Sequence, residues 1–350
     1  MSFDNEGIRV EEAKACLLCG QPGPVLYQGL RDRLFGSLGV WGLRQCAACG
    51  LLWLDPRPLH EDIGKVYADY YTHGQGAPPT PPSPPKVPRR EKAKHSVLAA
   101  QYGYLNPHAS LFWSSVGKVG RLLPLLRDVA GGFVRDFPWV PGGALLEVGC
   151  GDGRFLANMR GRGWRVMGIE PDPAAARVAR ERYGVEVAVG ALEDAALPAA
   201  SVDAIALTHV LEHVHEPMAL LQECGRVLKP AGRLVVETPN AQSWSHRLFG
   251  SAWRGLEPPR HLFLFSPASL HACAQKAGLQ IVSVRTTNRS GRMMYKASHA
   301  LRHQMRHPQV SYRPGRRVAF NSWVFLAAEE ARRLCDGKAG DTLLLIATRA

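Results

Sequence analysis

The chain has 350 residues, of which 46% are hydrophobic and 21% are charged, and its formal net charge is +13. This composition excludes an intrinsically disordered polypeptide and is sufficient for two folded domains. No stretch reaches the roughly 18 uninterrupted apolar residues that a membrane-spanning helix requires. The first twelve residues include four carboxylates and no apolar run, so we expect a cytoplasmic protein without a secretory signal.

Two Cys-x-x-Cys pairs lie near the start of the chain. Each pair is followed by glycine, and 26 residues separate them. This spacing is typical of four thiolates around a tetrahedral zinc, and a module this small needs a metal to stabilise its fold. An iron site and four free cysteines are the alternatives. We predict a zinc ribbon over residues 1–72, in which structural zinc is bound by Cys16, Cys19, Cys46 and Cys49. A fully ligated structural zinc leaves no open position for chemistry, so the module would position substrate or dock on the rest of the chain.

A proline-rich segment follows this module. Residues 78–85 read PPTPPSPP, a run that favours extended polyproline, and we predict a linker over 73–95. Apolar residues recur at near-helical spacing from Leu111 to Leu126, which predicts an amphipathic helix that Pro124 breaks or kinks. This helix belongs to a helical lead-in over 96–140. It would cover the core or the cofactor, and contact with a lipid surface is the alternative.

An apolar strand then runs into a glycine-rich turn. Residues 145–156 read LLEVGCGDGRFL, with Gly149, Gly151 and Gly153 at alternating positions. Glycine lets the backbone turn sharply and lets a nucleotide-type cofactor lie against bare amides at the mouth of a parallel sheet. The next strand ends at Glu170, about 20 residues downstream, where a carboxylate can accept the hydroxyls of a ribose. The spacing differs from the dinucleotide fingerprint, so no pyrophosphate need be bound.

The order of motifs resembles that of the class I S-adenosylmethionine-dependent methyltransferases. The glycine loop and ribose acid are followed by a loop at 190–197, the segment VDAIALTHVLEHVHEP at 202–217 with its Leu-Glu-His signature, and a turn leading into a strand at 233–237. The resemblance implies an α/β fold, a doubly wound, seven-stranded, mostly parallel sheet over 141–350, joined to the small N-terminal zinc ribbon. The last two strands would form an antiparallel hairpin, interrupted by a basic helical insertion at 285–340.

The resemblance also implies S-adenosylmethionine as the cofactor. Glu147 and the three glycines would surround its amino acid part, Glu170 would hold the ribose, and Leu192 with Glu193 or Asp194 would lie near the adenine. His209 is a further candidate for contact with the cofactor. The expected cofactor-binding set is Glu147, Gly149, Gly151, Gly153, Glu170, Leu192, Glu193 and His209.

Two later segments carry the candidate catalytic residues His261, His213 and Glu212. His209, Glu212 and His213 would share one face of a helix and resemble the Glu-x-x-Glu-His segment of quinone-biosynthesis O-methyltransferases, which holds a divalent metal. Because His209 replaces the first acid, a structural role for Glu212 and His213 is the alternative. His261 follows the fifth strand in the loop PRHLFLF and is the favoured general base, since imidazole titrates near neutral pH. Hydrogen bonding within a packed loop is its alternative role.

A long segment in the last third of the chain carries charged side chains of positive sign only. Between Glu257 and Glu329 there is no Asp or Glu, whereas there are eleven Arg or Lys. Such stretches attract phosphate, whether on nucleic acid, anionic lipid or a nucleotide-linked substrate, and a solvated surface is the alternative. Contact with the inner membrane face is one expectation for the basic insertion, and packing or a cap over the substrate mouth are the alternatives.

Zinc-ribbon fusions of this layout resemble sugar C-methyltransferases of antibiotic pathways and methyltransferases associated with surface polysaccharides. We therefore predict methyl transfer to a small or lipid-linked hydroxylated metabolite such as a sugar, polyketide or glycan precursor. The alternatives are a ribosomal RNA base methyltransferase, for which the basic charge would suit phosphate contacts, and a cofactor-binding protein without catalysis.

Overall fold

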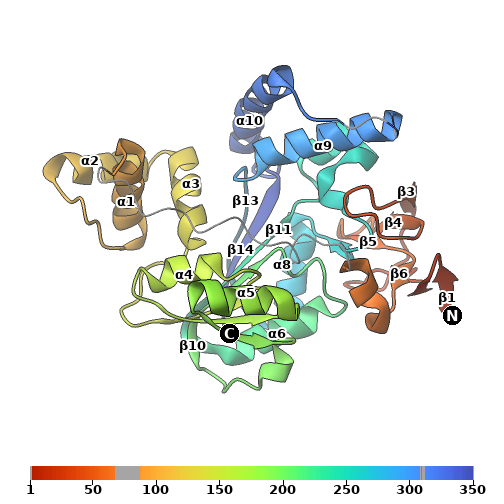
Figure 1. Cartoon of the computed structure of the whole chain (residues 1–350), viewed down its shortest axis with the longest axis horizontal. Coiled ribbons are helices and arrows are strands. Elements are labelled where there is room, and N and C mark those ends of the chain that lie inside the picture. Colours follow the sequence, from red (N-terminus) through yellow and green to blue (C-terminus); the bar gives the residue numbers. More distant parts are fainter. Residues whose placement is uncertain (1, 68–86, 308, 310–311, 350) are drawn as a thin grey trace.

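The computed structural model describes residues 2–67, 87–307, 309 and 312–349, so the proline-rich run at 78–85 lies outside the described residues. A seven-stranded sheet forms the centre of the molecule (Figure 1), with the strand order β13-β14-β11-β10-β7-β8-β9. All neighbouring pairs are parallel except the two made by β14, which runs against both β11 and β13. The doubly wound, mostly parallel sheet expected from the sequence is confirmed. Its strands are β7 (Ala144–Val148), β8 (Arg165–Glu170), β9 (Glu186–Val189), β10 (Val202–Thr208), β11 (Leu228–Pro239), β13 (Leu279–Thr287) and β14 (Thr342–Arg349).

Side chains of these strands alternate between two buried clusters. In β10, Ala204 and Ala206 belong to one cluster, and Ile205 and Leu207 belong to the other. Because successive side chains of a strand point to opposite faces, the two clusters are the cores on the two faces of the sheet. The first is covered by helices α4 (Arg154–Arg160) and α5 (Pro173–Tyr183), and the second by α6 (Pro217–Val227) and α8 (Pro267–Lys276).

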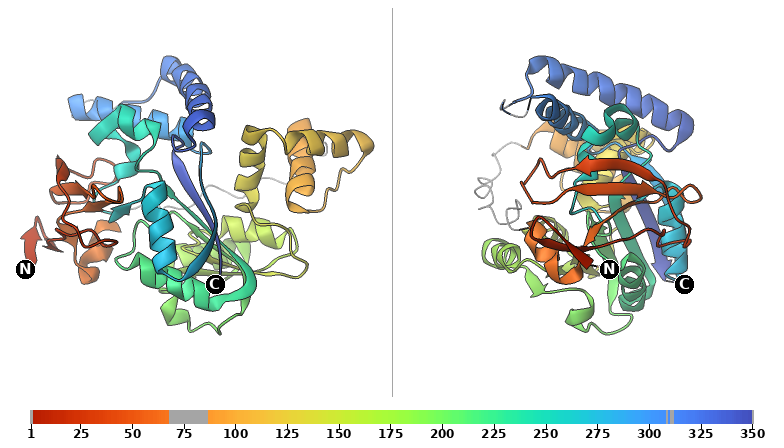
Figure 2. Two further views of the ribbon diagram at one scale, coloured as in Figure 1. Left: turned by 180° about the vertical axis from the view of Figure 1, so that it is seen from behind. Right: turned by 90° about the vertical axis from the view of Figure 1, so that its right-hand side faces the viewer.

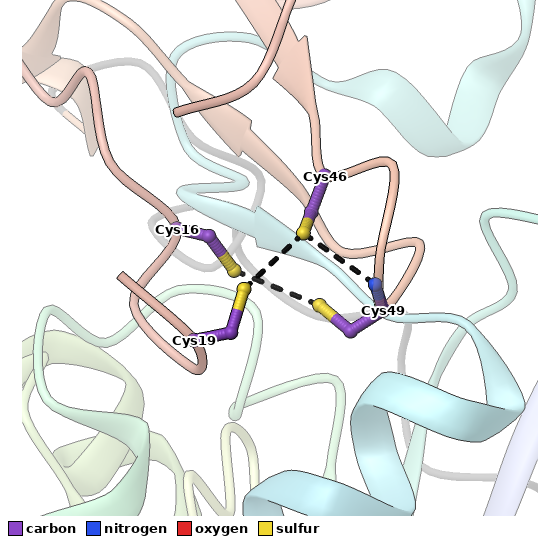
Figure 3. A group of neighbouring side chains, drawn as sticks. All are labelled: Cys16, Cys19, Cys46 and Cys49. Carbon is purple, nitrogen blue, oxygen red and sulfur yellow. Dashed lines mark hydrogen bonds between the residues drawn. The ribbon is translucent and has the colours of Figure 1, made fainter. Parts of the chain in front are cut away.

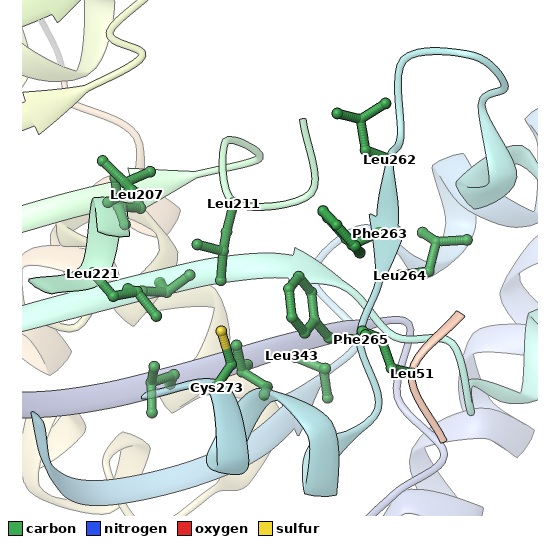
Figure 4. Packing of buried hydrophobic residues seen from close by; sticks show 14 of the residues in the cluster. Leu51, Leu207, Leu211, Leu221, Leu262, Phe263, Leu264, Phe265, Cys273 and Leu343 are labelled. Atoms are coloured by element: carbon green, nitrogen blue, oxygen red, sulfur yellow. The ribbon is translucent and has the colours of Figure 1, made fainter. Parts of the chain in front are cut away.

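The N-terminal module shares its core with the sheet domain. Strand β12 (Phe263–Leu264) pairs with β5 of the module, giving a small sheet in the order β12-β5-β4-β3. Leu51 of the module and Phe265 belong to one buried cluster (Figure 4). The boundary expected at residue 72 therefore does not separate two cores. The module consists of β1 (Ser2–Asn5), β2 (Ile8–Glu11), β3 (Val25–Leu30), β4 (Trp41–Gln45), β5 (Leu52–Leu54), β6 (Arg57–Pro58) and a 3-10 helix, η1 (His60–Tyr67).

Three helices that precede the sheet form a helical arm, residues 89–134, which stands to one side of the molecule (Figures 1 and 2). They are α1 (Arg89–Tyr102), α2 (Leu111–Gly120) and α3 (Pro124–Val134). The amphipathic stretch predicted from Leu111 to Leu126 is therefore two helices. The second begins at Pro124, which is well tolerated in the first turn because it lacks only an N–H that has no helical partner there. Helix α1 begins at Arg89, within the range 73–95 expected for the linker.

The hairpin of β13 and β14 is interrupted by two helices, as the sequence predicts for the basic insertion. They are α9 (Gly291–Arg306) and α10 (Arg316–Asp336), and they lie beyond the carboxyl end of β11 together with α7 (Trp244–Phe249). Trp244 of α7 stacks on Phe325 of α10 with ring centroids 4.9 Å apart. None of the described helices combines the length and the apolarity that crossing a membrane requires. The remaining short elements are 3-10 helices at Glu193–Ala195, Gly250–Ala252 and Arg254–Leu256.

Candidate active site

The glycine loop lies at the carboxyl end of β7, where two of its glycines have no room for a side chain. Gly149 has a φ of +71°, and a Cβ there would lie 2.5 Å from Cγ2 of Val210. Gly153 has a φ of +75°, and a Cβ there would lie 2.7 Å from Cβ of Ala179. Both contacts are shorter than van der Waals packing allows, and positive φ disfavours any residue with a Cβ. Gly151 also has a positive φ but faces open space, so a ligand can approach its backbone.

Glu170 ends β8 and is joined to the glycine loop by hydrogen bonds. Its Oε2 accepts from the backbone N–H of Gly151 at 2.7 Å, and its Oε1 accepts from that of Asp172 at 3.0 Å. The side chain is 7% exposed, and burial raises the pKa of this carboxyl. The two predicted cofactor elements therefore form one site at the carboxyl edge of the sheet, where open α/β sheets bind their ligands.

The next part of this edge lies beyond β9. Leu192 is buried, and Glu193 is exposed. The neighbouring Asp194 is exposed too, but its Oδ2 accepts a hydrogen bond from the backbone N–H of Ala191 at 2.9 Å. Of the two adjacent acids, Asp194 shapes the turn, which leaves the Glu193 carboxylate available to a ligand.

Glu147 is paired with an arginine that the sequence analysis did not single out. Arg135, which caps the end of α3, donates to Oε1 of Glu147 and lies 3.8 Å over the ring of Phe155. The other carboxylate oxygen, Oε2, is buried without a hydrogen-bond partner. Burial raises the pKa of Glu147 to about 7, although Arg135 opposes this shift. No spacing or motif around Arg135 marks it in the sequence, because tertiary packing brings it to Glu147.

His209 and Glu212 meet in the segment after β10, which is a turn and not a helix, so these residues do not share one helical face. Nδ1 of His209 lies 3.1 Å from Oε1 of Glu212. The Glu212 side chain is fully buried, whereas that of His209 is 46% exposed. Burial lowers the pKa of His209, but the hydrogen bond and charge of Glu212 outweigh this and raise it. Glu212 thus anchors an imidazole whose other nitrogen is accessible.

His213 turns away from His209 and faces His261 instead. The two rings meet edge to face at 4.7 Å between centroids, and potential ligand atoms of Glu212, His213 and His261 lie within 4.8 Å of one another. Nδ1 of His261 donates to the carbonyl of Gly255 at 2.8 Å, so its Nε2 carries the lone pair. Oε2 of Glu212 is buried without a hydrogen-bond partner. A carboxylate oxygen and two imidazole nitrogens suit a divalent transition metal, so these residues fit such an ion.

His261 lies deeper than we expected of a residue that contacts substrate. It is 4% exposed, and burial lowers its pKa to about 4 despite the nearby Glu257. A base this buried and this weak is poorly suited to accept a proton from a substrate at neutral pH. The geometry therefore favours His209 over His261 for that role.

The N-terminal module supports this part of the site directly. The hydroxyl of Tyr67 lies 2.9 Å from Nδ1 of His213. Arg260, which is fully buried, donates to both carboxylate oxygens of Asp32 and to Glu257. The carbonyl of Arg260 lies 3.1 Å from Nδ1 of His213. Module residues thus hold the loop that carries His261 and orient the His213 ring.

The four cysteines of the two Cys-x-x-Cys pairs converge in the module (Figure 3). The Sγ atoms of Cys16 and Cys49 are 3.6 Å apart, and those of Cys19 and Cys46 are 3.4 Å apart. A tetrahedron with Zn–S bonds of about 2.3 Å has edges of about 3.8 Å, so the cluster fits a zinc ion closely. The four cysteines that the spacing singled out are the ones whose side chains converge.

Comparison with known proteins places the chain in a family. Residues 124–284 match the family model described as "Methyltransferase domain". The malonyl-[acyl-carrier protein] O-methyltransferase of Serratia marcescens is 31% identical over 183 residues, which cover 51% of this chain and 71% of the relative. The chain belongs to the class I S-adenosylmethionine-dependent methyltransferases. Its cofactor is S-adenosylmethionine, as the glycine loop and ribose acid predict.

A second curated relative agrees with this methyltransferase assignment. A ubiquinone biosynthesis O-methyltransferase of Cereibacter sphaeroides is 31% identical over 207 residues, or 55% of this chain and 83% of the relative. A solved S-adenosylmethionine-dependent methyltransferase from Thermotoga maritima is 21% identical, with a TM-score of 0.42, and the match covers 68% of this chain and 95% of that one. The solved structure is similar in fold only.

Proposed function

We propose that this methyltransferase methylates an oxygen atom of a small or lipid-linked hydroxylated metabolite, with His209 as the general base. The observation that carries the proposal is the His209–Glu212 pair at the carboxyl end of β10. A buried carboxylate that accepts from Nδ1–H fixes the tautomer of an imidazole and leaves Nε2 to accept a proton. The names of the two relatives, both O-methyltransferases, support oxygen as the acceptor atom.

When bound, the cofactor supplies an electrophilic methyl group on its sulfonium sulfur. Nε2 of His209 would accept the proton of the substrate hydroxyl, so that its oxygen could act as the nucleophile toward that methyl group. Glu212 stabilises the imidazolium that forms, because its charge is buried and adjacent. Release of the proton to solvent restores the base, since His209 is exposed.

Cofactor binding is assigned to the carboxyl edge of the sheet. Glu147 and Arg135 are opposite charges that match the ammonium and carboxylate of an amino acid, and the unpartnered Oε2 of Glu147 supplies a ready acceptor. Glu170 would hold the ribose, and Leu192 with Glu193 would border the adenine. The backbone of Gly149, Gly151 and Gly153 would lie against the cofactor.

We assign the two metal-ligand clusters to support of the site. Cys16, Cys19, Cys46 and Cys49 would hold structural zinc, which stabilises the module that carries Tyr67 and Asp32. Glu212, His213 and His261 would hold a divalent ion that neutralises the unpartnered oxygen of Glu212. Because Glu212 and His261 are buried, this ion would join the two loops instead of binding substrate.

The ribosomal RNA alternative receives less support from the structure than from the sequence. Several arginines of the basic stretch are neutralised by carboxylates from earlier in the chain. Arg285 pairs with Asp128 at 2.8 Å and with Asp136 at 2.7 Å, and Arg289 pairs with Asp136 and Glu237. These guanidiniums are therefore not available to phosphate. Contact of the insertion with the inner membrane face also receives less support, because the same two guanidiniums are paired with carboxylates.

The proposal can be tested by following methyl-tritiated S-adenosylmethionine into host extract separated into lipid, RNA, protein and small polar fractions. We expect label in the lipid or small polar fraction, bound through oxygen, and much less label with the His209→Gln protein. The Glu170→Ala protein is the control for dependence on the cofactor. Label in RNA would overturn the proposal in favour of the nucleic-acid alternative.

A further inference from the structure

The helical arm, residues 89–134, exposes large apolar side chains along two of its helices. Leu111 is 91% exposed, Leu122 is 74%, Phe112 is 67% and Val119 is 60%. Others with at least two fifths of their surface exposed follow in α3, namely Leu125, Leu126, Val129 and Phe133. Isolated exposed apolar residues are ordinary on soluble proteins, but a contiguous group marks an interaction surface.

The opposite side of the arm is packed on the sheet. Val97 and Leu98 of α1 and Ala130 and Val134 of α3 belong to the buried cluster that includes Leu145 of β7. The arm therefore has two apolar sides, of which one completes the core. Its other side has no covering element among the described residues (Figure 2).

A groove deepens the exposed side. It has a volume of about 350 Å³ and runs between α1 and α3, with Val116, Leu126 and Phe133 among its lining residues. The groove reaches Val97, which also belongs to the buried cluster. Arg90, Glu91 and Lys94 also line it, and Lys94 pairs with Glu91. Nζ of Lys94 lies 4.2 Å over the Phe133 ring. A mainly apolar groove with Arg90 at its border suits the acyl part of an amphiphile.

The charge of the arm identifies the kind of partner. Residues 92–127 contain no Asp or Glu, whereas Lys118 and Arg121 are exposed on and next to α2, among the apolar side chains. A symmetric contact with a second copy of the arm would bring these cations together without a carboxylate to neutralise them. An anionic lipid surface supplies both apolar volume and negative charge.

We propose that the helical arm docks this methyltransferase on an anionic membrane surface. Leu111, Phe112 and Leu122 enter the boundary between head groups and acyl chains, and Lys118 and Arg121 meet the lipid phosphates. The arm is tied to the active site, because Arg135 follows α3 directly and Asp128 and Asp136 pair with Arg285.

The test is co-sedimentation of the full chain with vesicles, without any acceptor substrate. Vesicles of equal parts phosphatidylcholine and phosphatidylglycerol are compared with vesicles of phosphatidylcholine alone. We expect at least tenfold tighter binding to the anionic vesicles. The triple variant Leu111→Ser, Phe112→Ser, Leu122→Ser should lose at least tenfold, and Lys118→Gln with Arg121→Gln should lose about fivefold for each charge.

A matched control removes exposed apolar residues elsewhere. Leu38 and Val282 are 60% and 56% exposed, and Leu38→Ser with Val282→Ser should leave vesicle binding unchanged. All variants should keep the affinity for S-adenosylmethionine, which shows that they are folded. Equal binding to both vesicle types, or wild-type binding by the triple variant, would overturn the proposal. So would a dimer that the triple variant converts to a monomer while neither protein binds vesicles.

This inference does not depend on the acceptor proposed above. Vesicle binding is measured without methyl transfer, whereas the proposed function is tested by the fraction that receives label. Binding to anionic vesicles together with label in the small polar fraction would keep the docking surface and exclude a lipid-linked acceptor.

Discussion

The two clusters of potential metal ligands differ in how the chain assembles them. The four cysteines come from two four-residue turns inside one small module, and their Sγ atoms already lie near the edge length of a zinc tetrahedron. Glu212, His213 and His261 come from two loops nearly fifty residues apart, and Tyr67 from the module contacts one of them. The first cluster depends on local spacing, whereas the second depends on packing between the module and the sheet domain.

The largest effect should come from the cysteine cluster. We expect Cys46→Ser to abolish zinc binding and to lower the melting temperature of the whole chain by roughly 10 °C or more, because structural zinc contributes many kcal/mol of folding free energy. The module shares its core with the sheet domain, so the loss should not be confined to residues 1–67. Elemental analysis and calorimetry measure both quantities. Cys335→Ser, at an exposed cysteine outside the cluster, is the control and should change neither.

The second effect should separate the two histidine roles. We expect His209→Gln to lower methyl transfer by about 10²- to 10⁴-fold, the usual contribution of a general base, with little change in melting temperature. His261→Gln should instead lower stability, since its ring is buried and bonded to Gly255. Tritium transfer into extract and thermal unfolding distinguish them. Full activity of His209→Gln, with loss in a folded His261→Gln, would restore His261 as the base.

The third effect concerns the cofactor alone. Glu170→Ala should weaken S-adenosylmethionine binding by roughly 1.5 to 3 kcal/mol, because charge-assisted hydrogen bonds to the ribose are lost. Arg135→Ala should weaken it as well if the arginine meets the cofactor carboxylate. Calorimetric titration measures both affinities. Arg165→Ala, at an exposed position at the far end of β8, should bind as the wild type does, and unchanged affinity in Glu170→Ala would remove Glu170 from the site.

The smallest expected effect concerns two buried carboxyl groups that have no role in the proposed function. Glu329 of α10 and Asp341 are fully buried, and both approach Gly291. Burial and the neighbouring carboxyl raise the pKa of Glu329, and burial raises that of Asp341. A carboxyl whose pKa is raised on folding stabilises the protein below its unfolded pKa, and this contribution is lost as the pH rises toward the folded pKa.

Glu329→Gln removes one of these titrations, so its stability relative to the wild type should increase as the pH rises from 4 to 8. Denaturant unfolding at several pH values measures the difference. The neighbouring Glu330 is paired with Arg333, which lowers its pKa against the effect of burial, so Glu330→Gln should show the opposite trend. If the free energies of unfolding of the wild type and of Glu329→Gln changed with pH in parallel, the raised pKa of Glu329 would be contradicted.

Cofactor elements were largely predictable because their requirements are local. Glycines at 149 and 153 are needed where a Cβ would collide with Val210 and Ala179, and Glu170 follows its strand directly. Arg135 was not predictable, since its partner Glu147 lies across a turn and no pattern surrounds it. A shared helical face for His209, Glu212 and His213 required a helix after β10, but the segment is a turn with a positive φ at His209.

The sequence by itself determined the class I methyltransferase fold, the glycine loop with the acid that ends β8, and the four converging cysteines. The fold was implied by the resemblance in the order of motifs. The glycine loop follows from backbone conformations that only glycine adopts readily, and the cysteine cluster follows from thiolate spacing. Tertiary structure alone decided that His209 is accessible while His261 is buried, that the module and sheet domain share a core, and that the arm leaves an apolar side uncovered. Burial and pairing depend on residues that are distant in the sequence, so no local sequence pattern predicts them.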